Sequence, residues 1–198
     1  MMLLLKETAD FSYDAPIASE TNPKELVVKG LIQRANAENH NKRIYPKDIL
    51  FSKVQNYIDT KVIPKKAFGE LDHCDEATVE FKRVSHVIDK IWFEGDDVWA
   101  SVRILPTPNG EILKVIFESG STVGISSRAL GSVQKHGDVS IVNDDLHIIC
   151  WDFVTEPSTH NANMVKEARE LTESELKKVL SKEEQIERSI RHHLLNSF

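Results

Sequence analysis

Hydrophobic residues along this chain follow strand-like patterns more often than helical ones. Short runs rich in Val, Ile and aromatic residues, bounded by polar or turn-forming residues, are typical of strands with a buried face. Residues 81–105 combine two such runs around a turn at residues 94–97, which predicts an antiparallel hairpin with a bulge in its first strand. Further strands are expected at residues 26–32, 122–128, 130–135 and 146–155.

Two segments have a helical period instead. Residues 46–62 begin with Pro46, which suits the first turn of a helix, and then carry apolar residues at helical spacing. Residues 111–119 predict a short second helix, which Gly120 closes as a left-handed cap. The inward face of this second helix is expected to consist of Ile112, Val115 and Ile116.

The two ends of the chain differ in composition from its centre. Residues 1–25 are mixed and turn-rich, which predicts an N-terminal arm. Residues 161–198 are rich in charge and contain a capping box at residues 172–175, which predicts a separable helical tail. The domain itself is expected at residues 26–160, with the fold class α+β: a β-rich, partly closed antiparallel barrel with flanking helices.

Composition narrows the class of protein. A chain of 198 residues, 40% of them hydrophobic, can bury one core. Its net charge of −6 argues against a dedicated nucleic-acid binder, which would present a basic face. No apolar run approaches the roughly 20 residues that cross a membrane. The two cysteines, Cys74 and Cys150, lack metal-type spacing, so free thiols in a reducing compartment are expected.

Two short segments carry candidate chemistry. His73 ends the turn-like segment 69–73 (GELDH), and a histidine on a loop is the default general base near neutral pH. Ser126 and Ser127 are adjacent in a predicted strand, so their side chains face opposite ways and only one can reach a site. Each feature also has a plainer explanation: a surface histidine that caps a turn, and an ordinary strand end.

Asp152 interrupts the most apolar strand of the chain, residues 146–155. An unpaired buried carboxylate is costly, so Asp152 needs a partner. A histidine held by such a carboxylate is an oriented base, as in a serine–histidine–aspartate triad. An arginine partner, or an edge position that faces water, would explain Asp152 equally simply.

Three ordered blocks resemble one protein family: residues 39–46 (NHNKRIYP), 69–73 (GELDH) and 123–132 (VGISSRALGS). In sequence, order and separation they resemble the prohead core protein proteases of T-even-type tailed bacteriophages. The resemblance covers about residues 26–160, and three blocks in order are far more specific than any one motif. That family is similar in fold to the herpesvirus maturation protease, a β-barrel with flanking helices.

The resemblance implies a serine endopeptidase that acts in the procapsid interior, within the host cell cytoplasm. Its substrates would be phage scaffold or core proteins and the major capsid protein, cut after aliphatic-x-Glu, and it would also cleave itself. The resemblance implies no cofactor, no metal, no membrane and no direct contact with nucleic acid. It also implies a homo-oligomer or an assembly within the procapsid core.

Matched position by position, the family's catalytic histidine falls on His73 and its nucleophile on Ser126, while Asp152 stands where the acidic third member is expected. Backbone amides of the segment that follows the serines are expected to stabilise the oxyanion. The residues expected to support the oxyanion are Ser127, Arg128 and Gly131.

The chain departs from the family pattern at two positions. Cys74 stands where a proline often follows the histidine, and Ala129 stands where a glycine often follows the arginine. Alanine restricts the backbone, which puts the setting of an amide donor there in doubt. Neither change removes a reacting group.

Two aliphatic-x-Glu triplets lie near the ends of the chain, at residues 5–7 (LKE) and 171–173 (LTE). Self-cleavage would then follow Glu7 and Glu173, although such triplets also arise by chance in an acidic chain.

Two other classes of protein stay open on sequence grounds. A non-catalytic capsid, tube or scaffold component could use the same barrel, and it would have no need to keep the serine, histidine and aspartate together. A metal-dependent hydrolase could use His73 with its neighbours Cys74, Asp75 and His86, but this spacing matches no usual zinc pattern.

Overall fold

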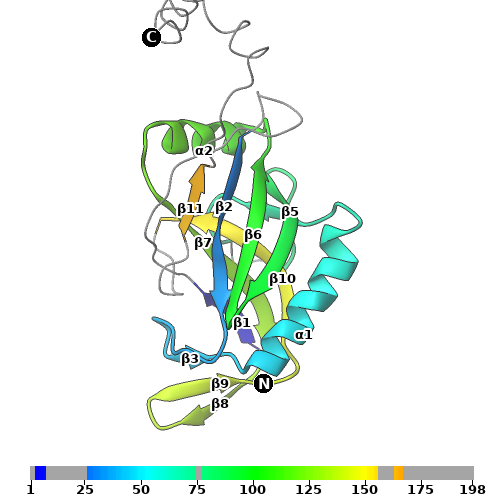
Figure 1. Cartoon of the computed structure of the whole chain (residues 1–198), viewed down its shortest axis with the longest axis vertical. Helices are drawn as coiled ribbons and strands as arrows, with labels where there is room; N and C mark the ends of the chain where they lie inside the picture. The colour runs from blue at the N-terminus through cyan, green and yellow to red at the C-terminus, as the bar shows by residue number, and fades with distance from the viewer. Residues whose placement is uncertain (1–2, 8–25, 75–76, 156–162, 167–198) are drawn as a thin grey trace, which may run out of the picture. The chain divides into compact units, whose positions relative to one another are not determined.

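The computed structural model describes residues 3–7, 26–74, 77–155 and 163–166. Within these residues the protein is β-rich with few helices, as the sequence predicts (Figure 1). The predicted helical tail, including Glu173, lies outside the described residues, apart from residues 163–166. No helix in the described part of the chain is long and apolar enough to span a membrane.

The described residues form strands and two helical segments. The strands are β1 (Leu3–Glu7), β2 (Val27–Arg34), β3 (Arg43–Ile44), β4 (Phe68–Glu70), β5 (Val84–Glu94), β6 (Asp97–Ile104), β7 (Val123–Gly131), β8 (Val133–His136), β9 (Val139–Val142), β10 (His147–Val154) and β11 (Asn163–Lys166). The helical segments are α1 (Lys47–Tyr57), which continues as a π-helical turn η1 (Ile58–Val62), and α2 (Pro108–Glu118).

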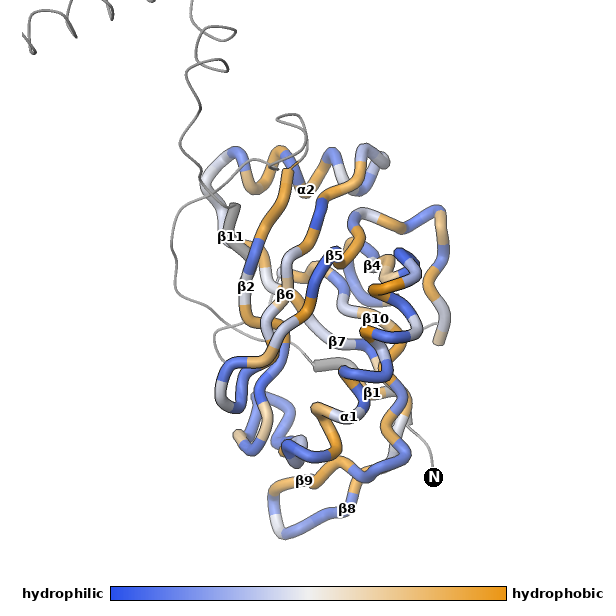
Figure 2. The backbone as a smooth tube through the Cα atoms, turned by 45° about the vertical axis from the view of Figure 1, so that its right-hand side comes forward, coloured by the Kyte–Doolittle hydropathy of each residue, from blue (hydrophilic) through white to orange (hydrophobic). Residues whose placement is uncertain are grey.

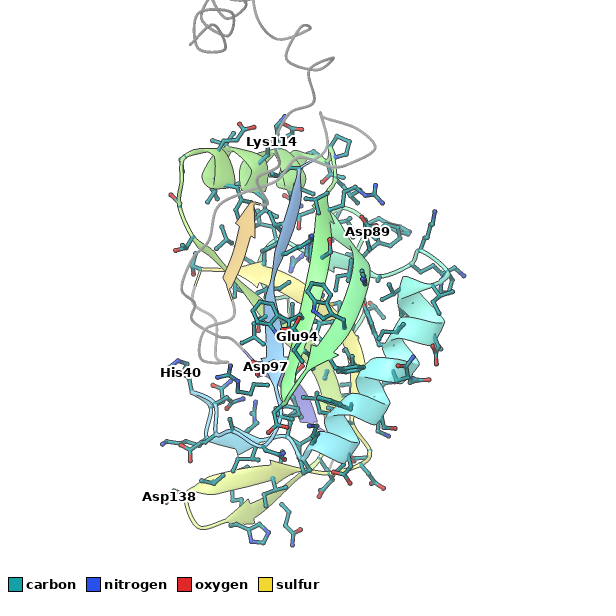
Figure 3. The ribbon with its side chains drawn as sticks, in the orientation of Figure 1. His40, Asp89, Glu94, Asp97, Lys114 and Asp138 are labelled. Atoms are coloured by element: carbon teal, nitrogen blue, oxygen red, sulfur yellow. The ribbon has the colours of Figure 1, made fainter. Side chains whose placement is uncertain are left out.

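One eight-stranded sheet forms most of the fold. Its strands follow the order β1-β7-β11-β2-β6-β5-β4, and β10 also pairs with β7. The end of β4 comes back to β10, where Leu71 forms a single parallel bridge with Phe153. In the described part of the chain this contact is a bridge and not a ladder, so strand pairing does not close the predicted barrel there. A smaller sheet has the order β3-β9-β8, and Asp138 marks the tip of its hairpin (Figure 3).

The main sheet reaches beyond residues 26–160. β1 comes from the predicted arm and pairs with β7, while β11 comes from the predicted tail and pairs with both β7 and β2. Each is only four or five residues long. Such strands depend on the backbone and packing of the strand they join, so their own sequences signal them weakly.

The core lies between the sheet and α1. The inner face of α1 buries Leu50, Val54 and Tyr57, and the Tyr57 ring meets Trp151 of β10 edge to face at 5.0 Å. Figure 2 shows hydrophobic and hydrophilic positions alternating along α2, as expected for a helix with one buried side.

The predicted inward face of α2 is wrong at Ile112 and Val115, whereas Ile116 is partly buried and packs against the core as predicted. Ile112 is 49% exposed and Val115 is 64% exposed, whereas Leu113 and Phe117 are buried. The helix begins three residues earlier than expected, at Pro108, with the Thr107 side chain as its N-cap. Gly110 then packs so closely that an added Cβ would lie 1.8 Å from the Leu105 carbonyl oxygen, and this contact sets which side of α2 faces the sheet.

Candidate active site

Two antiparallel strands place a serine beside an aspartate. In the β7–β10 pair, Ser126 lies directly opposite Asp152, and both residues are fully buried. Residues that face each other across an antiparallel pair project their side chains from the same face of the sheet. The register of these two strands therefore brings a hydroxyl and a carboxylate together.

The chain segment directly after β4 places a histidine beside Ser126 and Asp152. After Leu71 bridges Phe153, the backbone N–H of Asp72 donates a 2.8 Å hydrogen bond to the Phe153 carbonyl oxygen. Asp72 has a φ of +62°, a left-handed conformation that aspartate tolerates better than most residues. This turn brings the next residue, His73, to the buried pair on β7 and β10.

The His73 ring bridges the serine and the aspartate. Its Nδ1 lies 2.8 Å from Asp152 Oδ2, and its Nε2 lies 2.6 Å from Ser126 Oγ. When Nδ1–H donates to the ionised carboxylate, Nε2 is left to accept the serine hydroxyl proton. A hydroxyl, a base and a group that orients the base are the parts of an activated nucleophile.

The surroundings of Asp152 keep it ionised. Burial opposes ionisation, but the hydrogen bond from His73 and the charge of Arg128 outweigh it and lower the pKa of this carboxyl. Its other oxygen, Oδ1, accepts the backbone N–H of Glu70 at 3.0 Å. Asp152 can thus hold the His73 ring in one tautomer and stabilise its protonated form.

Arg128 lies behind the carboxylate and is fully buried. Its Nε is 3.0 Å from Asp152 Oδ2, and its Nη2 is 3.1 Å from Glu70 Oε2. The guanidinium also contacts the sulfur atoms of Cys74 and Cys150, both of which are free thiols as predicted. Burial raises the pKa of the Cys150 thiol, so this sulfur stays protonated near neutral pH.

Comparison with known proteins identifies the family of the chain. Residues 14–176 match the model of a family described as prohead core protein serine protease. The chain belongs to this family.

Two relatives support the assignment. The chain is 34% identical to the prohead core protein protease of Enterobacteria phage T4 over 154 residues, which are 76% of this chain and 72% of the relative. The solved structure of the bacteriophage T4 capsid assembly protease, gp21, matches with a TM-score of 0.73 and 30% identity. That match covers 79% of this chain and 99% of the other. The function is therefore that of a viral prohead maturation protease.

The residues expected to support the oxyanion have other surroundings in this prohead protease. The segment from Arg128 to Gly131 is not a loop, because β7 continues to Gly131 and pairs with β1 on one side and β10 on the other. Ser127 faces away from Ser126, and its hydroxyl makes no hydrogen bond to any of the described residues. The Arg128 side chain holds Asp152 instead of ordering an oxyanion loop. Ala129 lies in the β7 strand opposite Leu5 and Ile148, so this position needs no glycine conformation.

Sequence reasoning missed the role of two residues of the prohead protease. Glu70 lies inside the GELDH block, yet no pattern indicates that its side chain is buried against Arg128. The sequence gives His86 no role outside the metal alternative, and the structure buries it fully. Its Nε2 donates to the Trp151 carbonyl oxygen at 3.0 Å, its Nδ1 accepts from Ser85, and burial lowers its pKa to about 4.

One residue of the metal alternative, Asp75, lies outside the described residues. Both ring nitrogens of His73 and of His86 are engaged in hydrogen bonds. Among the residues that the structure describes, no group of three or more His, Cys, Asp or Glu side chains is arranged to hold a metal ion.

Proposed function

We propose that this prohead protease cleaves peptide bonds with Ser126 as nucleophile, His73 as general base and Asp152 as the residue that orients His73. The observation that carries this proposal is the His73 ring, whose two nitrogens lie 2.8 Å and 2.6 Å from Asp152 and Ser126. Ser126 Oγ attacks the scissile carbonyl carbon while its proton passes to His73 Nε2. The imidazolium then gives this proton to the leaving amine as the C–N bond breaks, and water releases the acyl group by the same steps in reverse.

The proposed substrates are the core or scaffold proteins and the major capsid protein inside the procapsid. The family description, a prohead core protein protease, supports this setting. We propose cleavage after aliphatic-x-Glu, catalysis by side chains without a cofactor, and an enzyme that assembles with itself or with the core. We also propose a relationship to the herpesvirus maturation protease, which the return of β4 to β10 supports.

The N-terminal strand supports a proposal of self-cleavage after Glu7. β1 contains Leu5, Lys6 and Glu7 and pairs antiparallel with β7, where Glu7 lies opposite Ser127. The bond after Glu7 therefore comes directly after the residue that pairs with Ser127, the neighbour of the proposed nucleophile. Extended peptides often bind by adding a strand to a sheet edge, so β1 lies as a substrate strand would.

The burial of Ser126 fits a precursor form. The residue is fully buried in this structure, so another peptide needs access at the β7 edge. β1 pairs with residues 127–131 of that edge and β11 with residues 123–124, so Ser126 lies between the two ladders. Release of residues 1–7 after cleavage would open the edge to substrates. A second proposed cut, after Glu173, lies outside the described residues.

Incubation of the enzyme with the core protein and capsid protein of its own phage tests the proposed specificity. Mass spectrometry of the new termini should place the cuts after aliphatic-x-Glu. Cuts after other residues would refute the proposed specificity, and intact substrates in the presence of self-processed enzyme would refute the proposed substrates.

A further inference from the structure

We propose that Glu70 is a positioning residue of the catalytic site, which holds Arg128 and the His73 segment and thereby sets Asp152 against His73. This inference rests on the proposed function, because it assigns a role around the same three residues. It starts from a charge that the mechanism leaves unexplained: the Glu70 side chain is fully buried, and burying a carboxylate is costly unless it is paired.

Glu70 contacts Asp152 directly and also through Arg128. Its backbone N–H donates to Asp152 Oδ1 at 3.0 Å. Its side-chain Oε2 lies 3.1 Å from Arg128 Nη2, and Arg128 Nε lies 3.0 Å from Asp152 Oδ2. Each oxygen of Asp152 is therefore held directly by Glu70 or through the arginine that Glu70 holds.

The Glu70 side chain also contacts residues that follow His73 in the chain, Glu80 and Arg83. Glu70 Oε1 accepts the backbone N–H of Glu80 at 2.5 Å, and Arg83 Nε lies 3.6 Å from Oε2. The Leu71 N–H donates to the Arg83 carbonyl oxygen, so the chain before His73 is bonded to the chain that follows it at Arg83. Glu70 thus joins the aspartate and the histidine of the site in one buried network.

Charge gives Glu70 a second effect. Arg128 supports Asp152, but its positive charge also opposes formation of the His73 imidazolium. The carboxylate of Glu70 offsets that charge, so the buried set of Glu70, Asp152 and Arg128 keeps one net negative charge for the imidazolium to balance. Without Glu70, the positive charge of Arg128 would balance the negative charge of Asp152. No net negative charge would then remain to stabilise the His73 imidazolium.

Other charged or titratable groups near His73 in the described part of the chain stay in place when Glu70 is substituted. They include Asp72 and Cys74 on either side of His73, the buried His86 on β5, the Cys150 thiol on β10, and Arg83, which is 39% exposed and also faces Glu80.

The test compares three variants of the full chain by NMR titration of ring-labelled His73 without substrate, and by cleavage kinetics. Glu70→Gln keeps the shape but removes the charge, and the double variant Glu70→Gln with Arg128→Met removes both charges of the pair. The control is Asp89→Asn, which removes a carboxylate from a half-exposed pair with Arg103 on β5 and β6 (Figure 3).

In Glu70→Gln the His73 titration midpoint should move about one pH unit lower, and kcat should fall about tenfold with KM within about twofold. The double variant should bring the midpoint back close to the wild-type value, and Asp89→Asn should move neither quantity. A wild-type midpoint in Glu70→Gln, with or without lost activity, would overturn the proposal, because packing alone would then explain the residue.

The double variant is a second test, read by the same titration after circular dichroism has shown that it folds. A midpoint near wild type supports the offset of the two charges. A midpoint raised by about one unit would mean that Arg128 acts without Glu70 and would overturn the proposal. The titration needs no catalysis, so it separates failure of the Glu70 role from failure of the proposed nucleophile.

Discussion

Arg128 lies 3.0 Å from Asp152 Oδ2, the same carboxylate oxygen that accepts the hydrogen bond from His73. The aspartate is therefore held between a permanent cation and the His73 imidazole, in a place that water does not reach. The electrostatics of the site depend on this buried pair as well as on the three proposed catalytic residues.

Loss of the arginine should destabilise the fold. Arg128→Met would leave Asp152 and Glu70 buried without their cation, and removing one partner of a buried ion pair typically costs about 3–5 kcal/mol. Denaturant unfolding monitored by circular dichroism measures this loss. Arg103→Met is the matched control, because its pair with Asp89 is half-exposed and should cost about 1 kcal/mol or less. Equal losses in the two variants would contradict the account.

Asp152→Asn should lower kcat. The amide nearly preserves the shape of the carboxylate, but it neither fixes the His73 tautomer nor stabilises the imidazolium. A decrease in kcat of about ten-thousandfold is expected, with KM changed far less. Steady-state cleavage of a core-protein peptide measures both constants. A variant that retained more than about a tenth of the wild-type kcat would show that Asp152 does not orient the base.

The strongest local patterns predicted the fold well, because they depend on neighbours in sequence. The β5–β6 hairpin has its turn where expected, and its register shift falls between Ile88 and Lys90, as the predicted bulge requires. The β10 strand likewise follows from its apolar run. β1 and β11 escaped prediction because their strand conformation comes from the partners they join.

The candidate site could be predicted only as separate parts. Strand geometry implied that one of Ser126 and Ser127 faces the site, and the family resemblance pointed to Ser126, whose hydroxyl contacts His73 in the structure. The meeting of the parts depends on the β7–β10 register and on the left-handed turn at Asp72, and both are properties of the assembled fold. Glu70 was missed because the sequence does not reveal that its side chain is buried.

Acid should destabilise the protein partly through His86. Burial lowers the pKa of His86 from 6.5 to about 4, so below pH 6.5 the unfolded chain takes up a proton that the folded chain excludes. The stability that His86 contributes is complete above pH 6.5 and is lost as the pH falls toward 4, with a slope of up to about 1.4 kcal/mol per pH unit. The stability that Asp152 contributes is lost at a lower pH, because, despite burial, the hydrogen bond from His73 and the charge of Arg128 lower the pKa of this carboxyl from 3.8.

Urea unfolding of wild type and His86→Gln between pH 7 and 4 checks this contribution. The glutamine can still donate to the Trp151 carbonyl oxygen, so the variant should lose most of the His86 slope. His147→Gln, at an exposed position on β10, should unfold with the wild-type pH dependence. The contribution of His86 would be ruled out if its variant kept the full wild-type slope.

Glu7→Gln should block processing of the N-terminus. Glu7 is the last residue of β1 and lies opposite Ser127, so the bond that follows it is the one nearest the nucleophile by register. Intact-mass measurement of the purified chain over time should show loss of residues 1–7 in wild type and retention in Glu7→Gln. Glu173→Gln should leave the N-terminal cut unchanged, and an intact N-terminus in mature wild-type particles would refute self-cleavage at Glu7.

The central claim is that Ser126, and not its neighbour, is the nucleophile. Ser126 Oγ lies 2.6 Å from His73 Nε2, whereas the Ser127 hydroxyl has no hydrogen-bond partner within the described part of the chain. The most direct measurement is the rate of core-protein cleavage by Ser126→Ala beside that of Ser127→Ala, with circular dichroism to show that both variants fold. Cleavage should fall by at least about a thousandfold in Ser126→Ala and should stay near the wild-type rate in Ser127→Ala. Full activity in Ser126→Ala would contradict the central claim.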